Sequence, residues 1–205
     1  MAARAPAWLP DERTRRTLSL NKEEDLRDTL ALVKTILSKI VEAPEEKKFR
    51  RLRASSRAVQ TRLLGRPGGR ELLKELGAKS RDDAVEFGGA DAATLAAALA
   101  WCDAFAPTTG VELKISLPRG PALRAAFGKD ETLRDATAFV DACAPSGAPH
   151  VLGTARPPEK FEDRLDRTLD FLGPRAALVA TPAAADPAAG EKAVDAARQK
   201  ALRDE

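Results

Sequence analysis

The first half of the chain repeats apolar residues at the spacing of an α-helix. Steps of three and four between Leu26, Leu30, Val33, Leu37 and Ile40 predict one long helix, for which the sequence offers an N-cap residue just before it. Similar spacings and capping residues indicate further helices in the same half. The predicted elements are helices at Asn21–Val41, Pro44–Leu64, Glu71–Leu76 and Asp91–Phe105, and an extended segment or small hairpin at Arg81–Gly89.

The period changes to two after the linker Ala106-Pro107-Thr108-Thr109-Gly110. The predicted elements are strands at Val111–Leu117, Ala122–Phe127, His150–Gly153 and Ala176–Ala180, a helix from Thr132 and a helical turn at Thr168–Gly173. This order is typical of a β-grasp domain, in which the helix covers one face of a mixed sheet. The predicted fold class is α+β, a small all-helical domain followed by a β-grasp domain. The predicted division is a flexible segment at 1–20, a helical domain at 21–106, a linker at 107–110, a β-grasp domain at 111–181 and an Ala- and charge-rich tail at 182–205.

The charge of the chain is unevenly distributed. Its 205 residues are 32% charged and have a formal net charge of +3, which fits one or two globular domains. The stretch from Lys47 to Arg70 nevertheless contains nine Lys or Arg residues and no Asp or Glu. Pro44–Leu64 is therefore predicted to be a cationic amphipathic helix. Three interpretations stay open: a solvated charged face, a binding surface for an acidic peptide, or a nucleic-acid surface.

The sequence contains no recognisable catalytic motif. Its two cysteines, Cys102 and Cys143, form no metal-ligand pattern and are too few for a disulfide scaffold, so we expect reduced thiols. The one histidine, His150, stands in a predicted strand, and no nucleophile elbow or phosphate-binding glycine loop occurs. We therefore predict a binding protein with no catalytic residue, no cofactor and no metal site. No apolar run is long enough to cross a bilayer and no secretory signal is recognisable, so we expect a cytoplasmic or nuclear protein. We also expect a monomer.

The basic stretch resembles a known domain. Residues 48–53 read Lys-Phe-Arg-Arg-Leu-Arg, with Ser56 and Val59 after them and Leu76-Gly77-Ala78 further on. Residues 21–105 thereby resemble the PUB domain, which occurs in peptide:N-glycanase and in proteins with UBA or UBX domains. The pattern of that family is roughly Lys-Tyr-Arg-x-Ile-Arg-x-x-Asn-x-x-Phe, then Leu-Gly-Phe. In this chain Ser56 stands where the family usually has Asn, and Ala78 stands where an aromatic residue is common.

The second half resembles the UBX domain, a ubiquitin-like β-grasp fold. The motifs are Ile115-Ser116-Leu117-Pro118-Arg119-Gly120, Thr132-Leu133-Arg134-Asp135 and Leu152-Gly153-Thr154-Ala155-Arg156-Pro157-Pro158. UBX domains usually hold the N-terminal domain of an AAA ATPase with a Phe-Pro-Arg loop and an Arg on the first strand. This chain has Arg156, Pro157 and Pro158 in the loop and Ser116 at the strand position. The resemblance therefore implies an intact fold with a degenerate binding loop.

A PUB domain followed by a UBX domain is similar to the adaptor proteins of valosin-containing protein, a hexameric AAA ATPase that extracts ubiquitylated substrates. The resemblance implies a non-enzymatic adaptor in the ubiquitin–proteasome pathway, whose PUB groove binds the acidic, aromatic-bearing C-terminal tail of the ATPase. The implied peptide-binding residues are Lys48, Phe49, Arg50, Arg53, Ser56, Gly77 and Ala78. The alternative is a basic scaffold that binds nucleic acid, which is disfavoured because no aromatic residues suited to base stacking are interleaved with the cations.

Overall fold

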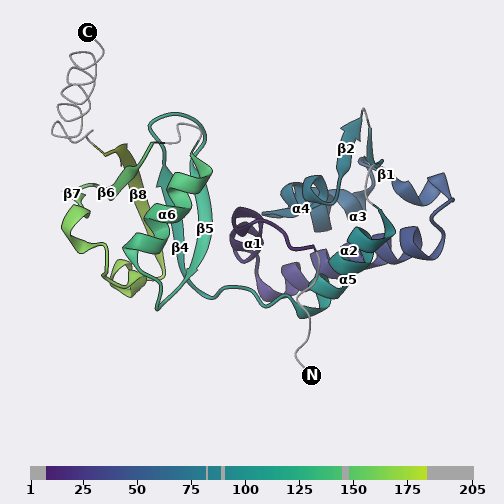
Figure 1. Ribbon diagram of the computed structural model, residues 1–205, viewed down its shortest axis with the longest axis horizontal. Coiled ribbons are helices and arrows are strands. Elements are labelled where there is room, and N and C mark those ends of the chain that lie inside the picture. The colour runs from purple at the N-terminus through teal and green to yellow at the C-terminus, as the bar shows by residue number, and fades with distance from the viewer. Residues whose placement is uncertain (1–7, 82, 89–90, 145–147, 184–205) are drawn as a thin grey trace, which may run out of the picture.

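A computed structural model describes residues 8–81, 83–88, 91–144 and 148–183 (Figure 1). The helices and strands form two groups, at residues 12–104 and 110–182, each with its own hydrophobic cluster. The fold class is mixed helix and sheet, as predicted. The predicted C-terminal tail lies outside the described residues from residue 184 onward.

Helices α2 (Glu23–Glu42) and α5 (Ala92–Ala104) form the body of the first group. The predicted apolar stripe is part of the buried face of α2, which consists of Leu26, Thr29, Leu30, Val33, Ile36, Leu37 and Ile40. The predicted cap Asp91 does cap α5, because its carboxylate accepts a hydrogen bond from a backbone N–H of the first turn. The predicted cap Asn21 does not cap α2. Its side-chain amide donates instead to two carbonyl groups outside the helix, and Lys22 holds the N-cap position.

The basic stretch is not one helix, so that prediction was wrong. It is divided into the 3₁₀ turn η1 (Lys47–Arg50), the strand β1 (Arg51–Arg53), the short helix α3 (Arg57–Val59) and the π-helical turn η2 (Gln60–Leu64). The alternation Arg-Leu-Arg suits a strand, since Leu52 packs against the core while Arg51 and Arg53 are exposed. The backbone of β1 finds its hydrogen-bonding partner in β3 (Ala84–Phe87), which lies further along the chain.

Strand β3 is the centre of a three-stranded antiparallel sheet in the order β1-β3-β2. Strand β2 (Ala78–Arg81) follows helix α4 (Gly69–Glu75) and forms a hairpin with β3. The hairpin was one of the two alternatives for Arg81–Gly89, and it begins earlier than predicted. The first group is therefore not all-helical, because β1 pairs with the β2–β3 hairpin, which lies further along the chain.

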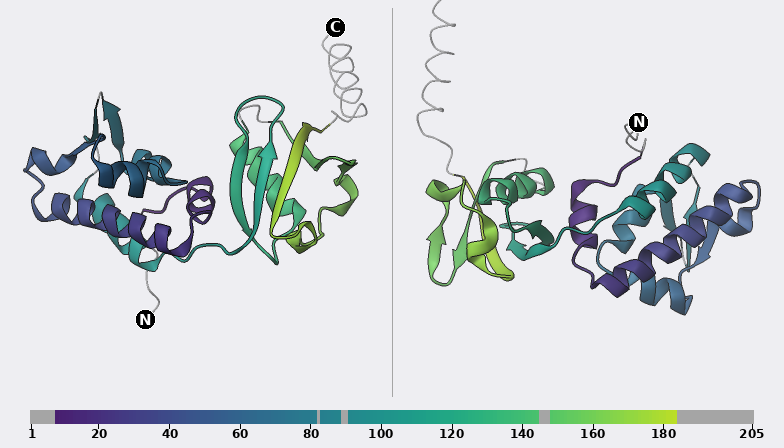
Figure 2. Two further views of the ribbon diagram at one scale, coloured as in Figure 1. Left: turned by 180° about the vertical axis from the view of Figure 1, so that it is seen from behind. Right: turned by 90° about the horizontal axis from the view of Figure 1, so that it is seen from below.

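The second group is a five-stranded sheet covered on one face by a helix (Figure 1 and Figure 2). Its elements are β4 (Gly110–Ser116), β5 (Leu123–Gly128), α6 (Leu133–Cys143), β6 (His150–Ala155), β7 (Pro158–Lys160), η3 (Glu162–Arg164), η4 (Leu169–Leu172) and β8 (Arg175–Pro182). The strand order is β5-β4-β8-β6-β7, with β4 and β8 parallel and the other pairs antiparallel. Thr132 and Asp135 begin α6 with a reciprocal capping box. The predicted hairpin, helix, strand, turn and strand are all present; β7 and η3 were not predicted.

A short helix, α1 (Glu12–Leu18), lies between the two groups (Figure 1 and Figure 2). Residues 1–20 were predicted to be a flexible segment, and residues 1–7 lie outside the described part. Helix α1 instead begins at the N-cap Asp11 and ends with Leu18 fully buried in the core of the first group. A seven-residue helix gains little from its own hydrogen bonds, so its stability must come from what it packs against.

Candidate peptide-binding site

The turn η1 presents three of the predicted peptide-binding residues. Phe49 is half-buried and packs against the core of the first group, so one part of its ring belongs to the core and another part stays accessible. The ammonium group of Lys48 lies 5.0 Å from the centre of the Phe49 ring, and it also forms an ion pair with Glu46 at 3.2 Å. The turn therefore offers an aromatic surface with a cation at its edge.

Arg50 has a different environment from Lys48. Its Nε donates to the carbonyl of Pro44, and its Nη1 donates to the carbonyl of Phe87, both at 3.2 Å. These bonds join η1 to the end of β3. Arg50 therefore supports the local fold, and it is less available to a ligand than the sequence suggested.

Gly77 and Ala78 lie where α4 turns into β2. Gly77 has φ +77, a conformation that favours glycine, and this lets the chain reverse direction. Ala78 is buried and stands opposite Phe87 in the sheet. Because Arg50 bonds the carbonyl of Phe87, the structure brings Arg50, Phe87 and Ala78 into one row.

Arg53 and Ser56 lie at the other end of β1. Arg53 stands opposite Ala84 and is exposed. Ser56 is half-buried at the N-cap position of α3, with no side-chain hydrogen bond to that helix. The predicted residues thus fall into two sets, one at each end of β1, and a strand of three residues spans about 10 Å.

The charge of the basic stretch is partly neutralised in space. Arg66 pairs with Asp25 at 2.7 Å and Arg62 with Asp28 at 3.8 Å, both on α2, while Arg51 pairs with Glu86 of β3 at 3.5 Å. Sequence reasoning missed these pairs because the acids lie outside the stretch. Among the described residues, no ion pair involves four exposed cations of the stretch, which are Lys47, Arg53, Arg57 and Arg70.

Residues 23–96 match the family model of the PUB domain. The match begins at the first residue of α2 and ends within α5, so it includes the three-stranded sheet and every predicted peptide-binding residue. PUB domains are protein-interaction domains, and they generally bind the tails of AAA ATPases. No curated protein matches the chain.

Outside the PUB domain, the residues of the predicted degenerate loop are exposed. Ser116 ends β4, and Arg156 and Pro157 form the turn between β6 and β7 through a cis peptide bond. Pro158 begins β7, and the hydroxyl of Thr154 donates to the carbonyl of Pro157 at 2.5 Å. The turn is therefore ordered by local hydrogen bonding, and it presents the exposed side chain of Arg156.

Cys102 and His150, two residues of types that often serve in catalysis, are both buried within the fold. Burial raises the pKa of the Cys102 thiol to about 12, so this thiol is neutral near pH 7. His150 is buried, and its Nδ1 lies 2.9 Å from the carboxylate of Asp141, which also accepts the backbone N–H of His150. Within the described ranges, no three His, Cys, Asp or Glu side chains gather as metal ligands, and no helix has the length and apolar character needed to span a membrane.

Proposed function

We propose that the chain is a non-enzymatic adaptor of an AAA ATPase of the valosin-containing protein type, acting in ubiquitin-dependent protein handling. Its PUB domain would hold the C-terminal tail of the ATPase. The observation that carries this proposal is the family match over residues 23–96, which encloses the surface around Phe49.

The surface is chemically suited to such a tail. The accessible part of the Phe49 ring offers apolar contact, and exposed cations lie at both ends of β1. An acidic tail that carries an aromatic side chain can use both features, since apolar contact supplies affinity and the cations attract the acids. Buried Ala78 takes up less volume than the aromatic residue common in the family, so we expect a shallower and weaker site.

The second group supports the UBX part of the proposal. Strand order β5-β4-β8-β6-β7, a parallel central pair and one covering helix are typical of the ubiquitin-like β-grasp fold. Because Arg156, Pro157 and Pro158 replace the Phe-Pro-Arg loop, we propose that this domain does not hold the N-terminal domain of the ATPase through that loop. We further propose a monomeric cytoplasmic or nuclear protein.

The arrangement of the cations in the structure supports nucleic-acid binding less well than their order in the sequence does. Seven of the nine cations of the basic stretch are divided among four elements, and Arg66 and Arg70 follow in a turn and in α4. Three of the nine pair with acids of α2 and β3. A continuous cationic helix that could follow a phosphate backbone is thus missing from this stretch.

Calorimetric titration of the full chain with a peptide of the ATPase C-terminal tail tests the proposal. We expect saturable one-to-one binding that a random oligonucleotide does not displace. A peptide with its acidic residues neutralised serves as the control and should bind more weakly. Failure of the tail peptide to bind, together with binding of the oligonucleotide, would overturn the adaptor proposal in favour of the nucleic-acid alternative.

A further inference from the structure

One side of α1 is fixed to the PUB domain. The carboxylate of Glu75 on α4 accepts hydrogen bonds from the Thr14 hydroxyl and, at 2.8 Å, from the Asp11 backbone N–H. Leu18 is fully buried in the core, and the Trp8 ring meets the Trp101 ring edge-on at 5.9 Å. The segment from Trp8 to Leu18 is therefore attached to the first group by both apolar and polar contacts.

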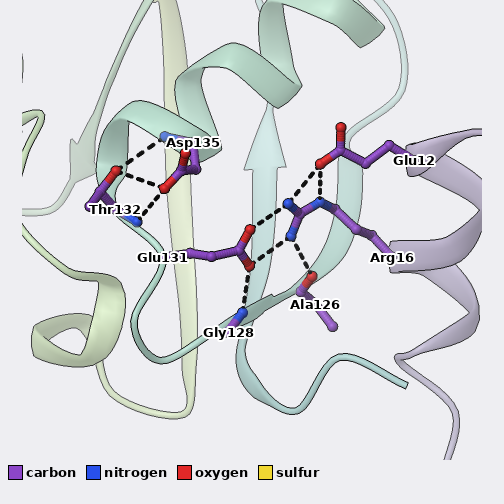
Figure 3. A network of polar contacts seen from close by, with 7 residues as sticks. All are labelled: Glu12, Arg16, Ala126, Gly128, Glu131, Thr132 and Asp135. Atoms are coloured by element: carbon purple, nitrogen blue, oxygen red, sulfur yellow. Dashed lines mark hydrogen bonds and ion pairs between the residues drawn. The ribbon is translucent and has the colours of Figure 1, made fainter. Parts of the chain in front are cut away.

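The opposite side of α1 reaches the second group through Arg16 (Figure 3). Its guanidinium group forms two parallel bonds to the carboxylate of Glu131, Nη1 to Oε2 at 2.9 Å and Nη2 to Oε1 at 2.5 Å. Nη1 also donates to the carbonyl of Ala126 at 3.1 Å, and the group lies 4.2 Å from the centre of the Phe127 ring. These contacts make a site on the second group that accepts an arginine in one orientation.

Burial makes this contact more than an ordinary surface ion pair. Arg16 is only 9% exposed, and the side chain of Glu131 is 29% exposed. Exposed pairs contribute little, whereas a buried charge that loses its partner is strongly destabilising. Glu131 is also held in place by the backbone N–H of Gly128 at 2.6 Å, and Arg16 by Glu12 of its own helix at 2.7 Å. Each side chain is therefore oriented by a contact within its own part of the molecule, Glu131 by Gly128 and Arg16 by Glu12, independently of the ion pair between them.

The linker between the two groups is tied to the same helix. The backbone N–H of Thr108 donates to the hydroxyl of Ser19, the C-cap residue of α1, at 2.9 Å. The linker and the end of α1 thus lie side by side between the two groups. A linker free of such contacts would leave the two groups to reorient independently.

We infer that the surface formed by Ala126, Phe127 and Glu131 is a docking site for α1, and that Arg16 docked there holds the PUB domain and the second group as one body in solution. The occupant is this chain's own N-terminal helix, because the same helix is anchored by Leu18 and Glu75 to the first group. The inference does not depend on any ATPase. Its consequence is that the ligand surfaces of the two groups face a partner in a fixed relative orientation, which favours simultaneous binding of both.

Backbone amide relaxation of the full chain in solution tests this inference. In the wild type, we expect residues 21–104 and 110–182 to give one common rotational correlation time. In Arg16→Ala, the two groups should give two different rotational correlation times, and both should be shorter than the wild-type value. Arg13→Ala is the matched control, since Arg13 is an exposed arginine on the same helix, and it should behave as wild type. Two separate correlation times in the wild type, or an unchanged Arg16→Ala, would overturn the inference.

A double-mutant cycle with Glu131→Ala distinguishes the docking contact from a general weakening of α1. If Arg16 acts through Glu131, the single variants should separate the groups to the same extent, and the double variant should add little. Circular dichroism first establishes that each variant is folded. Fully additive effects would show that Arg16 and Glu131 act independently, which contradicts the proposed docking site.

Discussion

At the scale of single residues, Glu131 should carry much of the pH dependence of the contact between the two groups. Burial on its own would raise the pKa of Glu131, but the hydrogen bonds from Arg16 and from the Gly128 N–H, together with the charge of Arg16, outweigh it and lower the pKa. The ionised form is therefore favoured in the folded state. Its stabilising effect is complete above the ordinary pKa of 4.5 and is lost as the pH falls through the lowered value.

Glu131→Gln should thus lower the free energy of unfolding at neutral pH by on the order of 1 kcal/mol and flatten its decline at acidic pH. Denaturant titrations of the wild type and the variant across this range measure both effects. Glu12 and Asp135 also face this site and remain in both proteins, so they supply a common background. An equally steep acidic decline in the variant would assign the pH dependence to those neighbouring groups.

Phe49 should act as the apolar anchor of the peptide site. Phe49→Ala is expected to weaken binding of the ATPase tail at every salt concentration, by on the order of 2 kcal/mol, because apolar contact is not screened by ions. Since Phe49 also packs against the core, circular dichroism must show a folded variant before the titration is interpreted. Wild-type affinity in the folded variant would place the anchor elsewhere.

Arg53 tests the electrostatic part of the same site. Arg53→Glu should weaken tail binding chiefly at low salt, with the difference fading as the screening length shortens to roughly 10 Å at 0.1 M. Arg53 is a better choice than Arg50, whose guanidinium group bonds the carbonyls of Pro44 and Phe87 and supports the fold. The control is Lys114→Glu, an equal change of charge at an exposed position of β4 in the second group, which should leave binding unchanged.

At the scale of elements, the junction between α1 and α4 depends on a glycine. Gly68 has φ +77 at the N-cap of α4, and an added Cβ would lie 2.7 Å from Cγ of Leu18. Gly68→Ala should therefore destabilise the protein by more than about 1 kcal/mol, through backbone strain and displacement of Leu18. Thermal unfolding measures the loss. Gly88→Ala is the control, because a Cβ there meets nothing within 4 Å; equal stability of both variants would contradict the steric argument.

The sequence alone predicted those elements that are determined by residues close together in the chain. The stripe of α2, the cap Asp91 and the start of α6 at Thr132 each depend on neighbours within a few residues, and the sequence predicted all three. Strand β1 could not be found in this way. Its Leu52 fits a helical stripe as well as a strand, and only the pairing with β3 decides between them.

Helix α1 was missed for a similar reason. Its stabilising partners are Glu75 and Glu131, which lie 61 residues from Thr14 and 115 residues from Arg16. A short Arg-rich segment whose three buried positions are Thr14, Arg16 and Leu18 has no periodic apolar signal of its own. The peptide-binding residues, in contrast, were proposed from a resemblance, and the structure adds which of them are exposed and which support the fold.

At the scale of the whole molecule, α1 stands between two interaction modules. The three-stranded sheet, which contains β1 and β2, lies on the far side of α1 and α4 from the second group (Figure 1). The turn between β6 and β7 lies on the second group, away from α1 (Figure 1). The two predicted ligand surfaces are thus separated in space, and a partner that contacts both must be large, as a hexameric ATPase is.

The sequence of the turn at Arg156, Pro157 and Pro158 leads to a prediction about the N-terminal domain of the ATPase. The full chain should bind the isolated N-terminal domain of the ATPase weakly or not at all, because Arg156 and Pro158 offer neither an inserted ring nor a terminal guanidinium, and Ser116 offers no cation. The variant S116R/R156F/P158R places the residues usual in UBX domains at these three exposed positions and should gain binding. Calorimetry with that domain alone, which lacks the C-terminal tail, isolates the loop from the PUB site. Micromolar or tighter binding by the wild type would show that the second group holds the ATPase through other residues, and the PUB domain would then be one of two anchors.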